Sequence, residues 1–170
     1  MTDLIKIDMG CGNSKKEGFV GVDITSTPSV DIVHDLRIIP YPFDNESADE
    51  IYSCHFFEHL DGPERVKHIE ECYRILVPGG TVTMVVPYYA SMRAIQDPTH
   101  KWPPVAEGSF LYFNKGWIKD NHLDHYNIKA DFDFTFGYDL APAWCNRNEE
   151  AKQFAVLHYT NVINNLQVVL

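Results

Sequence analysis

Long apolar runs are missing from this 170-residue chain, and so are clusters of basic residues. No stretch approaches the ~20 consecutive apolar residues of a membrane-spanning helix, and the N-terminus lacks the basic-then-apolar pattern of a secretion signal. The 14 Lys and Arg residues form no long run, and the formal net charge is −10. Because nucleic-acid binding depends on basic residues that neutralise phosphates, we expect no nucleic-acid partner and no membrane partner.

Cysteine pairs of the kind that bind zinc or form disulfide frameworks are also missing. The four cysteines, Cys11, Cys54, Cys72 and Cys145, form no CxxC motif. We interpret them as free thiols in a reducing compartment and predict a cytoplasmic protein. Internal repeats and linkers are absent from the sequence as well, so we predict a single domain over residues 1–170.

The first half of the chain has little room for helices between its predicted strands. Apolar stretches at residues 4–9 and 19–23 predict two strands, yet only residues 13–18 separate them, too few for a full crossover helix. Further strands are predicted at residues 31–36, 48–54 and 81–86. A short helical turn at residues 55–60 precedes one good helix over residues 63–76, with Val66, Ile69, Tyr73 and Leu76 on one stripe. Pro78-Gly79-Gly80 is expected to end that helix.

The second half is less regular. A short helix is predicted within residues 105–113, and the alternating aromatic residues of 132–138 predict a strand with one aromatic face. A helix at residues 148–160 and a strand at 164–170 complete the pattern. The fold class is therefore α/β, with a mostly parallel seven-stranded sheet, its last strands antiparallel, and reduced flanking helices.

Three features follow the ends of the first strands and point to a ligand site. Gly10-Cys11-Gly12 follows the first strand, Asp23 ends the second, and Asp35 ends the third. In an open α/β sheet, ligands bind at the carboxyl ends of the strands where the strand order reverses. Glycines let the backbone approach a ligand closely, and a carboxylate can accept hydrogen bonds from both hydroxyls of a ribose.

These motifs resemble those of the class I S-adenosylmethionine-dependent methyltransferases, in particular a subgroup of small methyltransferase-like proteins with a shortened first helix. The shared pattern covers residues 4–87 and comprises Asp8 to Gly12, Asp23, Asp35-Leu36, Glu58-His59-Leu60 and Arg74 to Gly80. The resemblance implies a Rossmann-like methyltransferase fold, an enzyme, and S-adenosyl-L-methionine as the cofactor. It also divides the domain into a cofactor-binding half, residues 1–87, and an acceptor-side, sheet-completing half, residues 88–170.

The resemblance further implies roles for individual residues. The glycine turn would approach the methionine part of the cofactor, Asp23 its ribose, and Ile24, Asp35 and Leu36 its adenine, while the end of the fourth strand would border the sulfonium. The predicted cofactor-binding residues are Asp8, Gly10, Cys11, Gly12, Asn13, Asp23, Ile24, Asp35, Leu36, Cys54 and His55.

The acceptor is expected to be a small molecule with a hydroxyl or amine group, such as a sugar or metabolite. His100 and His55 are the candidate general bases, with Asp97 as an orienting group for His100. The alternative is a cofactor-binding module with little catalysis, or an enzyme with a macromolecular acceptor. An open face around His55, Tyr88 and His100 would favour a macromolecular acceptor or a homodimer that completes the site.

Two other chemistries are less well supported by the sequence. His55-Phe56-Phe57-Glu58-His59 matches the HxxEH pattern of inverted zinc peptidases, but Gly62-Pro63 leaves too short a helix to place both histidines on one face. His122 and His125 have a metal-compatible spacing in a loop. We predict no metal. A dinucleotide site is disfavoured, because the third glycine and the first helix that would hold a pyrophosphate are missing.

Overall fold

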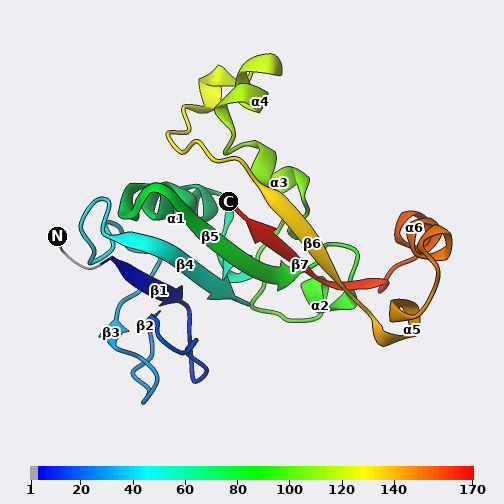
Figure 1. The fold of residues 1–170 in the computed structure, drawn as a ribbon, viewed down its shortest axis with the longest axis horizontal. Helices are drawn as coiled ribbons and strands as arrows, with labels where there is room; N and C mark the ends of the chain where they lie inside the picture. Colours follow the sequence, from blue (N-terminus) through cyan, green and yellow to red (C-terminus); the bar gives the residue numbers. More distant parts are fainter. Residues whose placement is uncertain (1–3) are drawn as a thin grey trace.

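Seven strands form one sheet in the order β3-β2-β1-β4-β5-β7-β6 in the computed structural model, which describes residues 4–170 (Figure 1). Strands β1 to β5 pair in parallel, whereas β7 pairs antiparallel with both β5 and β6. The prediction of a mostly parallel sheet that ends antiparallel is confirmed. The strands are β1 (Ile5–Met9), β2 (Val20–Asp23), β3 (Ile32–Val33), β4 (Ala48–Cys54), β5 (Leu76–Pro87), β6 (Thr135–Leu140) and β7 (Ile163–Val169).

Helices are few and mostly short in the described part of the chain. The longest, α1, has 14 residues, and an Asp61–Glu64 capping box closes its N-terminus. No helix within residues 4–170 is long and apolar enough to cross a membrane. The helices are η1 (Phe57–His59), α1 (Gly62–Ile75), α2 (Met92–Ile95), α3 (Gly108–Leu111), α4 (Lys115–Asp120), η2 (Asp124–Tyr126), α5 (Pro142–Cys145) and α6 (Glu149–His158).

Most predicted elements are present, but several boundaries differ. The Pro78-Gly79-Gly80 run lies within β5 instead of separating helix from strand. The β4–β5 pairing steps from Ala48–Leu76 to Glu50–Thr81, so the run lies at a bulge between paired residues. Strand β3 is shorter than predicted, helix α3 is confined to four residues, and β6 begins at Thr135.

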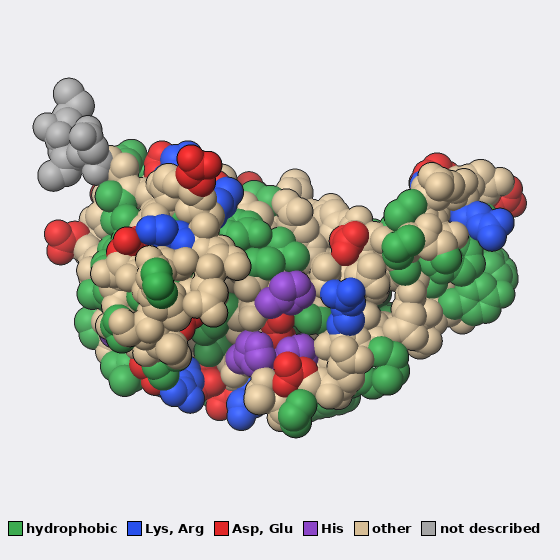
Figure 2. Space-filling model, turned by 90° about the horizontal axis from the view of Figure 1, so that it is seen from below, with side chains coloured by type: hydrophobic (Ala, Val, Ile, Leu, Met, Phe, Trp, Pro, Cys, Tyr) green, Lys and Arg blue, Asp and Glu red, His purple; other side chains and the backbone are tan. Residues whose placement is uncertain are grey.

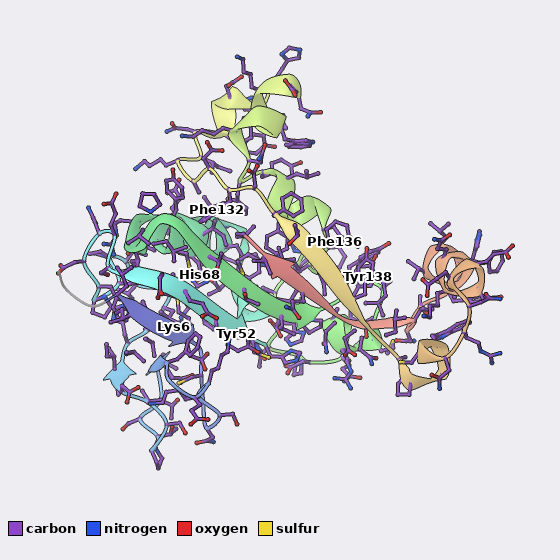
Figure 3. The ribbon with its side chains drawn as sticks, in the orientation of Figure 1. Lys6, Tyr52, His68, Phe132, Phe136 and Tyr138 are labelled. Carbon is purple, nitrogen blue, oxygen red and sulfur yellow. The ribbon has the colours of Figure 1, made fainter. Side chains whose placement is uncertain are left out.

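The buried face of α1 differs from the apolar stripe that the sequence predicts. Ile69, Cys72 and Ile75 are fully buried, together with the polar His68, whereas Tyr73 is 42% exposed. His68 is labelled in Figure 3, and its Nδ1 is hydrogen-bonded to the Tyr41 hydroxyl at 2.9 Å. A pattern of apolar residues misses this face because part of it is polar and satisfied by hydrogen bonds.

A compact set of side chains occupies the position where a helix between β1 and β2 would usually lie. The Lys16 ammonium lies 4.4 Å from the ring centre of Phe19 and 4.7 Å from that of Tyr52 on β4. Lys6 and Lys16 both pair with Glu50, at 2.9 and 3.1 Å. Lys6 and Tyr52 project from neighbouring strands in Figure 3. Cation–π contacts and aromatic packing therefore cover part of the sheet without a helix.

The other end of the sheet carries exposed aromatic residues. Phe136 and Tyr138 on β6 are both partly exposed, although the more N-terminal Phe132 is buried (Figure 3). Helices α5 and α6 lie beyond the far end of β6 and β7, away from β1 to β3 (Figure 1). The aromatic face predicted for residues 132–138 is thus core at one end and surface at the other.

Candidate functional site

A cavity of about 280 Å³ opens at the carboxyl ends of β1, β2 and β3. The sheet order reverses here, since β2 and β4 lie on opposite sides of β1. Gly10 follows β1, Asp23 ends β2, and Asp35 follows β3, so three features that are separate in the sequence meet at one site. The lining residues are Gly10, Asp23, Ile24, His34, Asp35, Leu36, Arg37, Phe56, His59 and Leu60.

The glycine turn after β1 requires glycine at its first position. Gly10 has φ +74°, and a Cβ built on it would lie 2.7 Å from Cβ and Cγ of Phe56. Gly12 also has a positive φ, and its N–H donates to Asp23 Oδ2 at 2.9 Å. The turn therefore packs tightly against the end of β4 and points a backbone N–H at the carboxylate of β2.

The Asp23 carboxylate is held in place from both sides. Its Oδ2 accepts from the Gly12 N–H, and its Oδ1 accepts from the Thr25 N–H at 2.9 Å. Each carboxylate oxygen has a further lone pair, so two hydroxyls can still bind. This geometry prepares an anionic acceptor for a vicinal diol at the cavity wall.

Asp35 forms a bidentate ion pair with Arg37 that the sequence did not predict. Arg37 Nε donates to Oδ1 at 2.9 Å, and Nη2 donates to Oδ2 at 2.7 Å. The Arg37 guanidinium holds the pKa of the Asp35 carboxyl below its usual range. Asp35 therefore stays ionised, and Arg37 becomes part of the same cavity wall.

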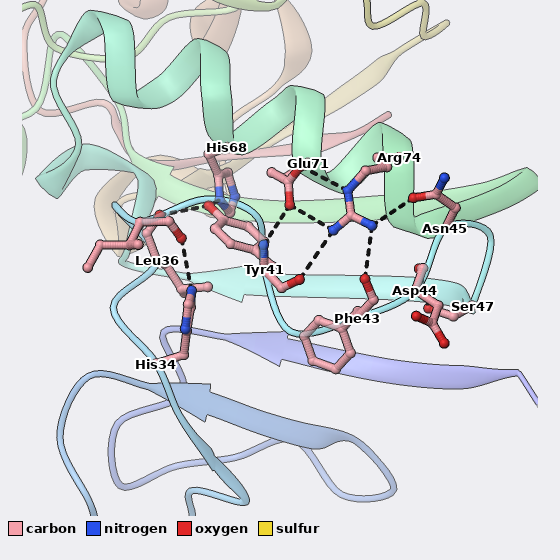
Figure 4. Close-up of polar contacts among 11 residues, drawn as sticks. His34, Leu36, Tyr41, Phe43, Asp44, Asn45, Ser47, His68, Glu71 and Arg74 are labelled. Carbon is pink, nitrogen blue, oxygen red and sulfur yellow. Dashed lines mark hydrogen bonds and ion pairs between the residues drawn. The ribbon is translucent and has the colours of Figure 1, made fainter.

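The loop that carries Leu36 is tied to helix α1 by a hydrogen-bond network (Figure 4). The Tyr41 hydroxyl donates to the Leu36 carbonyl at 2.7 Å and lies 2.9 Å from His68 Nδ1. The Tyr41 N–H donates to Glu71 Oε2 at 2.7 Å, and Arg74 bridges Glu71 to the carbonyl of Phe43. This network fixes the cavity wall after β3 to a rigid helix.

The two candidate bases, His55 and His100, are not among the cavity's lining residues, but each is close in sequence or in space to the lining residue His59. His55 has a left-handed backbone conformation, φ +55°, and its Nδ1 lies 3.1 Å from Glu58 Oε1. The Glu58 carboxylate raises the pKa of His55. His100 is nearly buried, with Nδ1 3.1 Å from the Ala94 carbonyl and Nε2 3.8 Å from Asp97 Oδ2. Figure 2 shows histidine side chains gathered in the middle of one face of the molecule.

Comparison with known proteins agrees with this arrangement. A family model described as a methyltransferase domain matches residues 15–84. A SAM dependent methyltransferase from Archaeoglobus fulgidus matches with a TM-score of 0.68, at 18% identity, over 99% of this chain and 86% of that chain. A SAM-dependent methyltransferase from Methanosarcina mazei matches with a TM-score of 0.53, at 15% identity, over 99% and 92% of the two chains. Residues 15–84 therefore match a methyltransferase domain, and the chain as a whole has the fold of the class I methyltransferases.

Two further matches are informative, one in sequence and one in fold. A tRNA (carboxymethyluridine(34)-5-O)-methyltransferase from Arabidopsis thaliana is 32% identical over 114 residues, which are 59% of this chain. The match spans only 28% of that protein's length. A chain from the complex that the Trm112 methyltransferase activator of Haloferax volcanii forms with a methyltransferase matches with a TM-score of 0.58, at 17% identity, over 99% and 82% of the two chains.

The methyltransferase domain brings some predicted residues to the cavity and leaves others outside its lining. Gly10, Asp23, Ile24, Asp35 and Leu36 line the cavity. Ile24 is more than half exposed there, as a surface that packs on a ligand would be. The predicted residues that are not among the cavity's lining residues are Asp8, Cys11, Gly12, Asn13, Cys54 and His55.

Asp8 and Cys11 are both buried, and burial raises the pKa of each side chain. Asp8 Oδ2 accepts from the Lys16 N–H at 2.7 Å. This bond holds the turn between β1 and β2. Burial raises the pKa of the Cys11 thiol to about 11, so the thiol is un-ionised at neutral pH.

Five lining residues of the methyltransferase domain were missed by the sequence reasoning. Arg37 could have been found, because an arginine two positions after an expected ligand carboxylate can pair with it. His59 and Leu60 belong to the Glu58-His59-Leu60 motif, which the sequence singled out without giving it a role. The sequence carried no signal for the other two, His34 and Phe56.

Proposed function

We propose that this chain binds S-adenosyl-L-methionine in the cavity at the ends of β1 to β3 and transfers its methyl group to an acceptor on the histidine-lined face. The observation that carries the proposal is the placement of Asp23 and Asp35 on one cavity wall beside the Gly10 turn. An acceptor for the hydroxyls of a ribose and a neighbouring site for adenine fit a nucleoside. The absence of a helix in the described link from β1 to β2 leaves no helix N-terminus for a pyrophosphate.

In this proposal, different residues of the site contact different parts of the cofactor. Asp23 accepts the ribose hydroxyls, Ile24 packs on the adenine, and Asp35 with the Leu36 N–H faces its polar edge. The Gly10–Asn13 turn lies toward the methionine part. Cys54 and His55, at and after the end of β4, border the sulfonium. Residues 1–87 then act as the cofactor half and residues 88–170 as the acceptor half.

The predicted acceptor face is open only in part, because His55 is exposed whereas Tyr88 and His100 are nearly buried. The side chain of His55 is 44% exposed, and Tyr89 and Met92, which follow Tyr88 in the chain, are about half exposed. We propose that this exposed part admits an acceptor larger than the small molecule that the sequence suggested. An exposed reaction site suits a hydroxyl or amine that projects from a larger molecule. The Arabidopsis relative acts on tRNA, which makes RNA the first acceptor to test and counts against the expected absence of a nucleic-acid partner.

A small-molecule acceptor is the second candidate. The net charge of −10 favours it, because an acidic chain binds phosphate backbones weakly without help. A Trm112-type activator, like the one in the Haloferax complex, is a partner that we propose to test for such help. A homodimer that completes the acceptor site would be another. The cytoplasmic location stays a prediction.

Methyl transfer needs alignment more than activation, because the sulfonium of the cofactor already activates the methyl group. A hydroxyl or amine acceptor also has to lose a proton. The His55–Glu58 pair is suited to take it, since the carboxylate orients the imidazole and stabilises its protonated form. A general base of this kind contributes about 10²–10⁴-fold to a rate.

Two measurements test the proposal. The first is calorimetric titration of the full chain with S-adenosylmethionine and S-adenosylhomocysteine, and the absence of binding to either would refute it. The second is transfer of a radiolabelled methyl group to bulk tRNA and, separately, to a low-molecular-weight metabolite fraction, with and without a Trm112-type protein. Label in the tRNA supports the RNA acceptor, and label only in the metabolite fraction supports the second candidate.

A further inference from the structure

Three potential metal ligands meet beside the cofactor cavity. Glu58 and His59 come from the single turn η1, and His100 comes from the loop that follows α2. One potential ligand atom from each of these residues lies within 4.8 Å of the others. The rings of His59 and His100 pack edge to face with their centres 4.8 Å apart.

Glu58 has a buried carboxylate oxygen without a partner among the described residues. The side chain is only 5% exposed, and Oε1 is occupied by the His55 imidazole at 3.1 Å. Oε2 is buried and forms no hydrogen bond. Buried carboxylate oxygens almost always have a partner, so this atom points to a ligand that the protein chain itself does not supply.

Hydrogen bonds leave the second nitrogen of each histidine available. His100 Nδ1 lies 3.1 Å from the Ala94 carbonyl, which can only accept, so Nδ1 carries the proton and Nε2 keeps its lone pair. The Thr99 hydroxyl donates to Asp97 at 2.6 Å and lies 3.0 Å from His59 Nδ1, so it accepts the Nδ1 proton of His59. Metal-binding histidines are oriented by the same kind of contact.

Buried contacts hold the two ligand-bearing segments together. The Lys101 N–H donates to the Glu58 carbonyl at 2.8 Å. The largely buried Arg65 donates to the carbonyl of Pro103 at 2.6 Å, to that of Lys101 at 3.3 Å and to that of Phe57 at 3.3 Å. The cluster is therefore organised by its surroundings before any ligand binds.

We propose that Glu58, His59 and His100 bind one divalent transition-metal ion. Two imidazoles and one carboxylate favour ions such as Mn²⁺, Co²⁺ or Zn²⁺ over Mg²⁺ and Ca²⁺, which prefer all-oxygen sites. The arrangement differs from that of the HxxEH peptidases, because Glu58 is a ligand and His55 only orients it. Because His59 also lines the cofactor cavity, the ion would lie between the cofactor and the acceptor face. An acceptor hydroxyl could occupy an open coordination position of the ion, and the ion would lower the pKa of that hydroxyl. This role rests on the proposed function.

Cobalt(II) titration of the chelator-treated, tag-free full chain tests the site, with visible absorption as the readout. We expect one equivalent to bind with the spectrum of nitrogen and oxygen ligands. His100→Gln and Glu58→Gln should each weaken binding more than tenfold. Thr99→Val keeps all three ligands but removes the acceptor for His59 Nδ1, and should weaken binding about 10–100-fold. His125→Gln, on the exposed η2 turn, is the matched control and should bind as the wild type does.

The result that would overturn the proposal is a wild-type chain that shows no saturable cobalt binding, or variants and control that bind equally well. Circular dichroism checks that each variant is folded, and Thr99→Val decides the question if a ligand variant is not. S-adenosylhomocysteine titration of the same samples separates the two proposals. Nucleoside binding without cobalt binding refutes the metal site alone, whereas cobalt binding without nucleoside binding refutes the proposed function alone.

Discussion

Replacing Asp23 with asparagine gives the sharpest test of the cofactor cavity. The carboxylate already accepts N–H groups of Gly12 and Thr25 on its two oxygens, and it has lone pairs left for two ribose hydroxyls. Asparagine keeps one acceptor oxygen and presents an NH₂ group in place of the other. One backbone N–H then faces a donor, and one ribose hydroxyl loses its acceptor.

The expected loss follows from these contacts. A hydrogen bond to a charged group contributes about 1.5–3 kcal/mol, so the loss of one such bond and of the charge weakens nucleoside binding by about 3 kcal/mol. This corresponds to a roughly 100-fold higher Kd for S-adenosylhomocysteine. The stranded backbone N–H should also lower the free energy of unfolding by about 1 kcal/mol. Calorimetry measures the first effect, and urea unfolding measures the second.

Glu50→Gln is the matched control for Asp23→Asn. Glu50 is a carboxylate of the same sheet that binds Lys6 and Lys16 and is not among the cavity's lining residues. It should leave the Kd for S-adenosylhomocysteine unchanged within twofold. If Asp23→Asn binds the nucleoside as tightly as the wild type, or if both variants lose affinity equally, the assignment of Asp23 to the ribose is wrong.

Three further predictions concern the framework of the site. Gly10→Ala should lower the free energy of unfolding by about 1–3 kcal/mol in urea titrations, because the new Cβ meets Phe56 at 2.7 Å and the backbone has a positive φ; wild-type stability would show that the turn can shift. Tyr41→Phe should cost about 1–3 kcal/mol and lower Tm by several degrees in calorimetry, because the Leu36 carbonyl and the His68 imidazole lose their shared partner. Burial lowers the pKa of His68 from 6.5 to about 4, so the unfolded chain takes up a proton that the folded chain does not. Stability should therefore fall by up to about 3 kcal/mol as the pH drops from 6.5 to 4, and an unchanged pH dependence in His68→Gln would contradict this.

The cofactor half of the fold was predictable because its signals are local. The strands of residues 4–9 and 48–54 are recognisable from apolar stretches, and the short link at residues 13–18 leaves no room for a helix whatever the tertiary structure. The carboxylates of Asp23 and Asp35 come at strand ends, and parallel pairing then brings strand ends to one edge. Sequence order and strand direction together therefore place half of the residues that line the cavity.

The remaining features depend on contacts between distant residues. The buried face of α1 includes His68, which no apolar pattern would select, because its burial requires the hydroxyl of Tyr41 on a loop. His100 reaches Glu58 and His59 only because Arg65 and the Lys101 N–H join the two segments. The pairing of Asp35 with Arg37 is local, but a charged pair two residues apart can equally face solvent. Hydrogen bonds between distant residues, such as those of Tyr41 and Arg65, are not visible in a single sequence.

Charge connects the metal site with the choice of acceptor. The chain carries a net charge of −10, and the acceptor face carries histidines, with the exposed Arg93 close enough to oppose the rise in the pKa of His55 that Glu58 causes. A divalent ion on Glu58, His59 and His100 would add two positive charges at the point where the acceptor docks.

An RNA acceptor should then depend on the ion for docking as well as for proton loss. Methyl transfer to tRNA would fall steeply when the metal is removed, whereas transfer to a neutral sugar hydroxyl would lose only the effect on its pKa. The metal dependence of each acceptor thus distinguishes the two proposed acceptor classes as well as testing the site.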